Sequence, residues 1–153
     1  MIWLLRHGDA EDGDGDDATR RLTPKGEAQA RAAGQALASL GIEIDTCLAS
    51  PKVRALDTAQ IACEALGVDV EECAQLRGGA FDPHALTAGR GNTLLVGHEP
   101  DLSGAVGAAT GANVQFKKGG LATIDGALLL RLFRPPEIRA LARQEASSAR
   151  RRG

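Results

Sequence analysis

The chain has 153 residues, and its 43% hydrophobic and 25% charged content is typical of one globular domain with a sizeable core. Aromatic residues make up only 3% and tyrosine is absent, which disfavours binding of single-stranded nucleic acid by base stacking. The three cysteines are too few for a disulfide framework or a zinc clip, so we expect reduced, buried thiols. No signal peptide precedes the first strand and no apolar run is long enough to span a bilayer, so we expect a cytoplasmic protein with no membrane or nucleic-acid partner.

The net charge of −2 is unevenly distributed along the chain. Residues 131–153 hold seven arginines and two glutamates, a net of +5, so the other 130 residues carry −7. This end could contact an acidic partner or nucleic acid, but the favoured interpretation is a solvated last helix with a frayed basic tail over residues 147–153. Neither a repeat nor a linker interrupts the chain, so we expect a single domain over residues 1–153.

The first predicted element is a buried strand at residues 2–5, an apolar run that stops before Gly8. An acidic, glycine-broken loop follows at residues 9–17. Thr23 and Pro24 then predict the start of a helix, because threonine caps free amide groups and proline needs no N–H bond in the first turn.

A short predicted strand at residues 44–49 leads to Ser50 and Pro51. This pair repeats the cap-and-proline pattern and predicts a helix over residues 52–66. Arg54 falls in the first turn, where the helix dipole disfavours a cation by up to about 1 kcal/mol. Its position makes sense if the helix end and the guanidinium hold an anion together. A plain surface arginine is an equally open interpretation.

The remaining elements alternate between strands and helices. The pattern predicts an edge strand at residues 68–73, a helical turn at 83–88, a buried strand at 92–96, a helix at 101–109, a hairpin at 121–133 around Asp125-Gly126, and a closing helix from Pro135. Such alternation predicts a three-layer α/β/α sandwich with a mostly parallel central sheet.

Four side chains with phosphate-binding chemistry fall at predicted strand ends or helix starts. Arg6 and His7 follow the first strand, and His98 follows the buried strand at residues 92–96. Because ligands bind beyond the carboxyl ends of strands in open α/β sheets, we expect these groups to meet Arg54 around one pocket. Two arginines and two histidines suit a tetrahedral phosphoryl group, and a neutral imidazole is a competent nucleophile toward phosphorus. The spacing contains no metal-ligand pattern, so we expect neither a metal nor another cofactor.

The same segments resemble the histidine phosphatase superfamily, which has a phosphoglycerate mutase-like fold. The resemblance covers nearly the whole chain to about Phe133 and is most similar to the SixA-type phosphohistidine phosphatases, a small bacterial branch. It depends on an ordered set of motifs: Leu5-Arg6-His7-Gly8-Asp9-Ala10, Arg20-Arg21-Leu22-Thr23-Pro24-Lys25-Gly26, Ser50-Pro51-Lys52-Val53-Arg54-Ala55-Leu56-Asp57-Thr58-Ala59, Val96-Gly97-His98-Glu99-Pro100 and Phe116-Lys117-Lys118-Gly119.

The resemblance implies that His7 is the nucleophile that becomes phosphorylated, and that Arg6, Arg54 and His98 form the phosphate pocket. Gly8 belongs to the same motif. Asp17 and Arg20 match an acidic residue and an arginine that face the substrate or support the site in SixA-like chains. A salt bridge within the loop is the alternative interpretation of that pair.

The general acid is less well defined. Glu99 occupies the position of the catalytic carboxylate of acid-phosphatase relatives, but it could instead cap the helix that follows. Asp17 is the other candidate. A phosphoramidate leaves as imidazole, which solvent can protonate, so the lack of a clear acid favours a P–N substrate.

The short segments between the strand-end groups predict an open site, which would be a poor water-excluding chamber for a mutase. The sequence therefore favours a metal-independent phosphatase acting on phosphohistidine in a signalling phosphotransfer protein. A broad phosphomonoesterase acting on small phosphorylated substrates is the second hypothesis, favoured by Glu99. A non-catalytic phosphoprotein-binding module is the third. A Rossmann nucleotide-binding site is excluded, because no G-x-G-x-x-G pattern follows the first strand.

Overall fold

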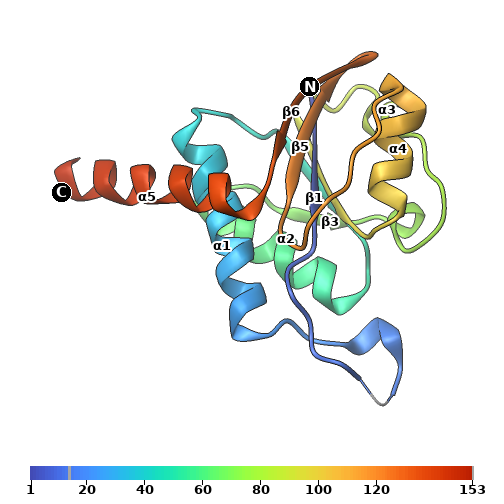
Figure 1. Cartoon of the computed structure of the whole chain (residues 1–153), viewed down its shortest axis with the longest axis horizontal. Helices are drawn as coiled ribbons and strands as arrows, with labels where there is room; N and C mark the ends of the chain where they lie inside the picture. The colour runs from blue at the N-terminus through green and yellow to red at the C-terminus, as the bar shows by residue number, and fades with distance from the viewer. Residues whose placement is uncertain (14, 153) are drawn as a thin grey trace.

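The computed structural model describes residues 1–13 and 15–152, in which a single sheet is flanked by helices (Figure 1). The strands are β1 (Ile2–Arg6), β2 (Thr46–Ala49), β3 (Val70–Glu72), β4 (Thr93–Gly97), β5 (Leu121–Asp125) and β6 (Leu128–Phe133). The helices are α1 (Pro24–Ser39), α2 (Val53–Leu66), α3 (Pro83–Thr87), α4 (Asp101–Thr110) and α5 (Pro135–Arg152), with 3₁₀ turns η1 (Asp17–Thr19) and η2 (Ala74–Leu76).

The first strand of the chain lies inside the sheet, whose order is β3-β2-β4-β1-β5-β6. β1 pairs in parallel with β4 on one side and antiparallel with β5 on the other. β4 and β3 both pair in parallel with β2, and β6 closes the opposite edge as an antiparallel partner of β5. This arrangement confirms the predicted mostly parallel sheet, with the hairpin as its antiparallel part.

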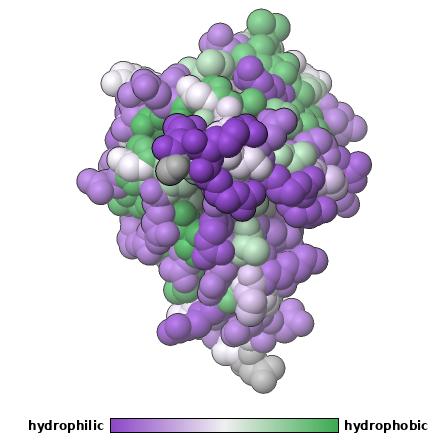
Figure 2. Space-filling model, turned by 90° about the vertical axis from the view of Figure 1, so that its left-hand side faces the viewer, coloured by the Kyte–Doolittle hydropathy of each residue, from purple (hydrophilic) through white to green (hydrophobic). Residues whose placement is uncertain are grey.

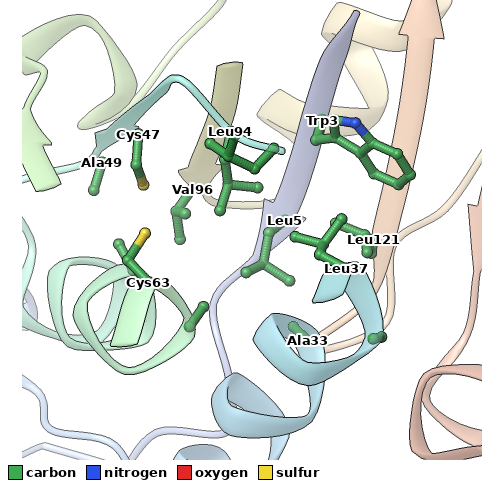
Figure 3. Close-up of a cluster of buried hydrophobic side chains, with 14 of the residues drawn as sticks. Trp3, Leu5, Ala33, Leu37, Cys47, Ala49, Cys63, Leu94, Val96 and Leu121 are labelled. Carbon is green, nitrogen blue, oxygen red and sulfur yellow. The ribbon is translucent and has the colours of Figure 1, made fainter. Parts of the chain in front are cut away.

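The two faces of the sheet carry separate apolar cores, because alternate residues of a strand point to opposite sides. Trp3 and Leu5 of β1 pack on one face against α1, α2 and α5 (Figure 3). Leu4 packs on the other face, in the core that contains Leu102 of α4. The observed structure is therefore the predicted three-layer sandwich. On the first face α1 and α2 come so close that a β-carbon added at Gly34 would meet the backbone of Ala62.

The helix starts explain part of the local structure. The Thr23 hydroxyl accepts a hydrogen bond from the Gly26 N–H at 3.1 Å, which confirms the predicted cap of α1. The predicted Ser50 cap is wrong, because α2 begins only at Val53 and the side chain at its capping position, Lys52, makes no capping hydrogen bond. The Ser50 hydroxyl is engaged elsewhere, with a histidine described below.

The C-terminal helix projects beyond the sheet, with the chain end at its far tip (Figure 1). Where the sequence analysis expected a frayed tail from Ser147, α5 continues to Arg152, and Gly153 lies outside the described residues. The segment is rich in alanine and arginine, which favour helix, and Arg152 donates to Glu145 at 3.2 Å two turns earlier. The face seen from this end is largely hydrophilic (Figure 2). In the part of the chain that is described, no helix has the length and apolarity needed to cross a membrane.

Candidate active site

The pairing of β1 with β4 brings the two predicted histidines together. Arg6 lies opposite Gly97 in the register, so His7 and His98 leave the sheet side by side. Their ring centroids are 5.2 Å apart with the planes tilted by 57°, and both side chains are buried. β2, the other neighbour of β4, places Ser50 at the same edge. The expected meeting of separate strand ends is therefore observed.

The His7 ring is held in one tautomer. Its Nδ1 lies 2.7 Å from the carbonyl oxygen of Gly8, and because a carbonyl only accepts, Nδ1 must carry the proton. The lone pair is then on Nε2. Burial, together with the nearby Arg54 and Arg6 charges, lowers the pKa of His7 from 6.5 to about 4. The ring is thus neutral at physiological pH, as a nitrogen nucleophile must be.

The backbone around His7 is fixed by close contacts. The Gly8 N–H donates to the Thr58 hydroxyl at 3.1 Å, and that hydroxyl donates to the Arg54 carbonyl oxygen at 2.7 Å. A β-carbon at Gly8 would collide with the backbone of Gly26 at the start of α1, so only glycine fits there. Gly8, which the resemblance placed in the site, therefore shapes the turn that carries His7.

Each arginine is anchored by some of its donors and keeps others unpaired. Arg6 Nη1 donates to the Phe116 carbonyl oxygen at 2.8 Å, and Arg54 donates through Nη1 to the Asp17 carbonyl oxygen at 2.8 Å and through Nη2 to its carboxylate at 3.2 Å. The Nε atoms of both arginines are buried without a partner among the described residues. Burial lowers the pKa of Arg6, partly offset by the charge of Glu99. The unused donors suit a bound oxyanion.

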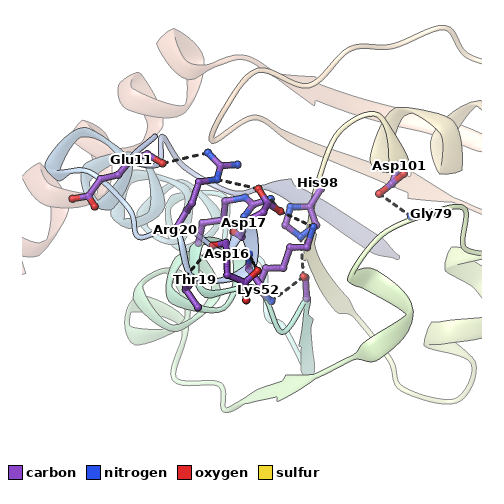
Figure 4. Close-up of polar contacts among 12 residues, drawn as sticks. Glu11, Asp16, Asp17, Thr19, Arg20, Lys52, Gly79, His98 and Asp101 are labelled. Atoms are coloured by element: carbon purple, nitrogen blue, oxygen red, sulfur yellow. Dashed lines mark hydrogen bonds and ion pairs between the residues drawn. The ribbon is translucent and has the colours of Figure 1, made fainter. Parts of the chain in front are cut away.

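The Asp17 carboxylate lies among cationic side chains, near His98 (Figure 4). Its carboxylate accepts from Lys52 Nζ at 3.0 Å and from Arg20 Nε at 3.0 Å, in addition to Arg54. Hydrogen bonds from Lys52 and Arg54 hold the pKa of Asp17 well below its usual range. The predicted pair of Asp17 and Arg20 is thus a salt bridge that also orients Arg54.

Glu99 is turned toward backbone amides. One oxygen accepts from the Ser103 N–H in the first turn of α4 at 2.8 Å, and the other accepts from the Phe116 N–H at 3.3 Å. The carboxylate therefore caps α4 and fixes the segment that holds Arg6, which matches the capping interpretation.

Two residues of the site were missed by the sequence analysis, namely Ser50 and Thr58. Both are fully buried. Ser50 follows β2 as His98 follows β4, and its hydroxyl lies 2.8 Å from His98 Nε2. Thr58 lies one helical turn after Arg54. The same strand-end reasoning that selected the histidines could have selected Ser50, but its pattern was interpreted as a helix cap.

Two open grooves meet this cluster. One, of about 630 Å³, is lined by Arg6, Glu99 and residues 113–117. The other, of about 400 Å³, is lined by Asp17, Lys52 and Arg77. The grooves therefore reach Arg6 and Asp17 at the edges of the cluster, whereas His7 and His98 are buried and line neither groove.

Comparison with known proteins identifies the family. The chain belongs to the histidine phosphatase superfamily, because the model of branch 1 of that superfamily matches residues 2–111. A structure of the protein histidine phosphatase SixA complexed with tungstate shares the fold, with a TM-score of 0.78, 23% identity, and coverage of 90% of this chain and 98% of that chain. A protein described as a candidate phosphohistidine phosphatase SixA from Nakamurella multipartitia has a TM-score of 0.69 and 25% identity, over 88% of this chain and 95% of its own.

Curated relatives are similar over a shorter stretch. The mitochondrial serine/threonine-protein phosphatase Pgam5 of Drosophila ananassae is 44% identical over 85 residues, which is 54% of this chain and 29% of the relative. The Pgam5 of Drosophila willistoni is 47% identical over 86 residues, with the same shares. The chain therefore spans less than a third of the length of these relatives.

Proposed function

We propose that the protein is a metal-independent phosphatase that works through a phosphohistidine intermediate on His7, with phosphohistidine on a signalling phosphotransfer protein as its substrate. One observation carries the proposal: a buried, neutral His7 has its Nδ1–H tied to the Gly8 carbonyl, so that Nε2 is available next to His98 and the cationic Arg54. Family membership and the SixA-like fold support it.

In the first step, the Nε2 lone pair of His7 forms a bond to phosphorus while the bond to the leaving group breaks. The leaving nitrogen or oxygen keeps the bonding pair and takes up a proton. Arg6 and Arg54 neutralise charge on the phosphoryl oxygens with the Nε donors that no described residue binds. In the second step, water adds to phosphorus, the P–Nε2 bond breaks, and the water proton passes to phosphate or solvent.

The two carboxyl candidates for a general acid are unsuited to that role. Glu99 has both oxygens on backbone amides, and the cations around Asp17 keep its carboxylate ionised. An alkoxide leaving group needs a positioned acid more than an imidazole does. This supports a P–N substrate over a phosphate ester, and it weakens the phosphomonoesterase hypothesis, which depended on Glu99.

Protein substrates are supported by the open grooves beside Arg6 and Asp17 and by the relatives named as protein phosphatases, although that name specifies serine and threonine esters. Roles in signal transduction and a cytoplasmic location belong to the same proposal. The mitochondrial Pgam5 relatives make location a point to test directly by fractionation.

The first experiment traps the intermediate. Wild-type protein mixed with a radiolabelled phosphodonor and quenched in alkali should retain label that is lost in acid, as phosphohistidine is, whereas His7→Ala should retain none. Equal labelling of both proteins would refute His7 as the nucleophile. Binding of phosphate without label transfer or turnover would favour the non-catalytic module.

The second experiment ranks substrates by kcat/KM. A phosphorylated histidine transfer domain, a phosphoserine peptide and p-nitrophenyl phosphate are compared at one ionic strength. The proposal expects the transfer domain to be turned over fastest. Faster turnover of the small ester would favour the phosphomonoesterase, and faster turnover of the peptide would favour a Pgam5-like specificity.

A further inference from the structure

Ser50 connects two parts of the site through one hydroxyl. The residue is fully buried at the end of β2, and its Oγ lies 2.8 Å from Nε2 of His98. The same oxygen accepts a hydrogen bond from the Lys52 backbone N–H at 3.2 Å. Because an amide N–H only donates, that contact leaves the hydroxyl proton of Ser50 free for another acceptor.

The proton count then determines the state of the His98 ring. Among the described residues, Nε2 of His98 is the acceptor within reach of the Ser50 hydroxyl. A neutral imidazole that accepts at Nε2 carries its proton on Nδ1. Burial, with the charges of His7, Arg54 and Lys52 outweighing that of Asp17, lowers the pKa of His98 to about 3, so the ring is neutral at physiological pH.

The other ring nitrogen of His98 lacks a hydrogen-bond partner among the described residues. Nδ1 of His98 is buried, and the described residues offer it no partner. A buried polar atom without a partner is unfavourable unless a ligand satisfies it. The nearest candidate is an anion on His7, whose ring lies 5.2 Å away. Phosphoryl oxygens accept hydrogen bonds, so an N–H at this position would bind them and a lone pair would repel them.

We propose that Ser50 is a positioning residue that fixes the tautomer of His98, so that the neutral ring presents an Nδ1–H donor to the phosphoryl group. The phosphoryl ligand in this inference rests on the proposed function. A histidine without a fixed tautomer would have to be protonated to be sure of donating from Nδ1 to a phosphate oxygen. The Ser50 bond removes that requirement, because the ring can donate without first taking up a proton.

The decisive measurement is the tautomer itself. In protein labelled with ¹⁵N, long-range ¹H–¹⁵N correlation at pH 7 reports which ring nitrogen of His98 carries the proton. The expected result is Nδ1–H in the wild type and in Ser50→Thr, which keeps a hydroxyl. Ser50→Ala should shift the ring toward Nε2–H. Thr123→Val, which removes a buried hydroxyl that donates to the Ile2 carbonyl instead, is the matched control and should behave as the wild type.

Phosphate binding provides the second readout. Titration with inorganic phosphate should show affinity about 10- to 100-fold weaker in Ser50→Ala than in the wild type, since a hydrogen bond to a charged acceptor is lost. Ser50→Thr should recover most of that loss. An unchanged affinity in a Ser50→Ala protein with an altered tautomer would overturn the donor role of Nδ1.

The inference also fails if wild-type His98 carries its proton on Nε2, a result that requires no variant to fold. It fails equally if the tautomer is the same in Ser50→Ala and the wild type. These outcomes are separable from failure of the proposed function, because the tautomer is measured without turnover. A protein that hydrolyses none of the three substrates but shows the Ser50-dependent tautomer and phosphate affinity would refute the phosphatase proposal alone.

Discussion

Acidification should destabilise the protein through the two buried histidines before most carboxylates are protonated. The unfolded chain holds both rings at a pKa of 6.5, whereas the folded values are about 4 for His7 and about 3 for His98. Because the folded values lie below the unfolded one, the unfolded state binds more protons. The stability that comes from the neutral rings is therefore complete above pH 6.5 and is lost as the pH falls toward 4 and then 3.

The magnitude follows from these values. At pH 5 each ring is protonated in the unfolded chain and almost neutral in the folded one, so unfolding takes up close to one proton per histidine. The free energy of unfolding should then fall by about 1.4 kcal/mol per pH unit for each ring. Between pH 8 and pH 5 this amounts to about 1–2 kcal/mol for each histidine, a large share of the stability of an average domain.

The assay is urea unfolding at half-unit pH steps from 8 to 5. Proton uptake on unfolding is taken from the slope of the free energy of unfolding against pH. The wild type should approach an uptake of about two protons at pH 5, and His98→Gln should lower it by about one. His84→Gln is the matched control, since this exposed histidine lies on α3 and bonds to the Gly126 carbonyl oxygen. A slope that is flat between pH 6.5 and 5, or one that His98→Gln leaves unchanged, would refute the buried neutral state of the rings.

Four further substitutions test other parts of the structure. Gly34→Ala would drive a methyl group into the α2 backbone at Ala62 and should lower the free energy of unfolding by about 1–3 kcal/mol, whereas Gly104→Ala in α4, where the added carbon meets nothing, should raise it by about 0.5–1 kcal/mol. Denaturant titration of the pair checks this, and equal shifts of one sign would contradict the helix packing. Asp17→Asn removes the charge that holds Arg54 and should slow single-turnover labelling of His7 by about tenfold or more. An unchanged labelling rate would show that Asp17 does not orient Arg54. Arg54→Lys loses the paired hydrogen bonds that Nη1 and Nη2 donate to Asp17, and it should reduce kcat/KM by at least as much as Asp17→Asn does. A smaller reduction of kcat/KM would place Arg54 outside the site.

The sequence predicted the sheet and the meeting of the two histidines because both follow from local pattern plus one topological rule. Apolar runs such as residues 2–5 indicate buried strands, and the carboxyl ends of parallel strands lie at the same edge of the sheet. The register that sets Arg6 opposite Gly97 was not predictable, since it depends on pairing across some 90 residues. Some strand boundaries also differ from the prediction. The strand predicted at residues 44–49 begins only at Thr46, because its first two residues form a loop.

The side-chain network was less predictable for a different reason. The hydroxyl of Ser50 can cap a helix or bind a neighbouring side chain, and only the position of His98 on the next strand decides between them. A glutamate directly after His98 could serve as a catalytic acid or as a helix cap. The hydrogen bonds that Glu99 accepts from the Ser103 and Phe116 amides show that it is a cap. Local sequence restricts such residues to a few partners, and tertiary structure chooses among them.

The place of β1 within the sheet has a consequence for synthesis. This strand is translated first, yet its two neighbours, β4 and β5, lie about 90 and 120 residues further along the chain. A growing polypeptide therefore contains β1 and His7 without the strands that flank them in the folded protein, and loops of that length make pairing slow as well as late. The pairing that sets Arg6 opposite Gly97 can therefore form only after β4 has left the ribosome, and β1 is enclosed on both sides only after β5 has followed.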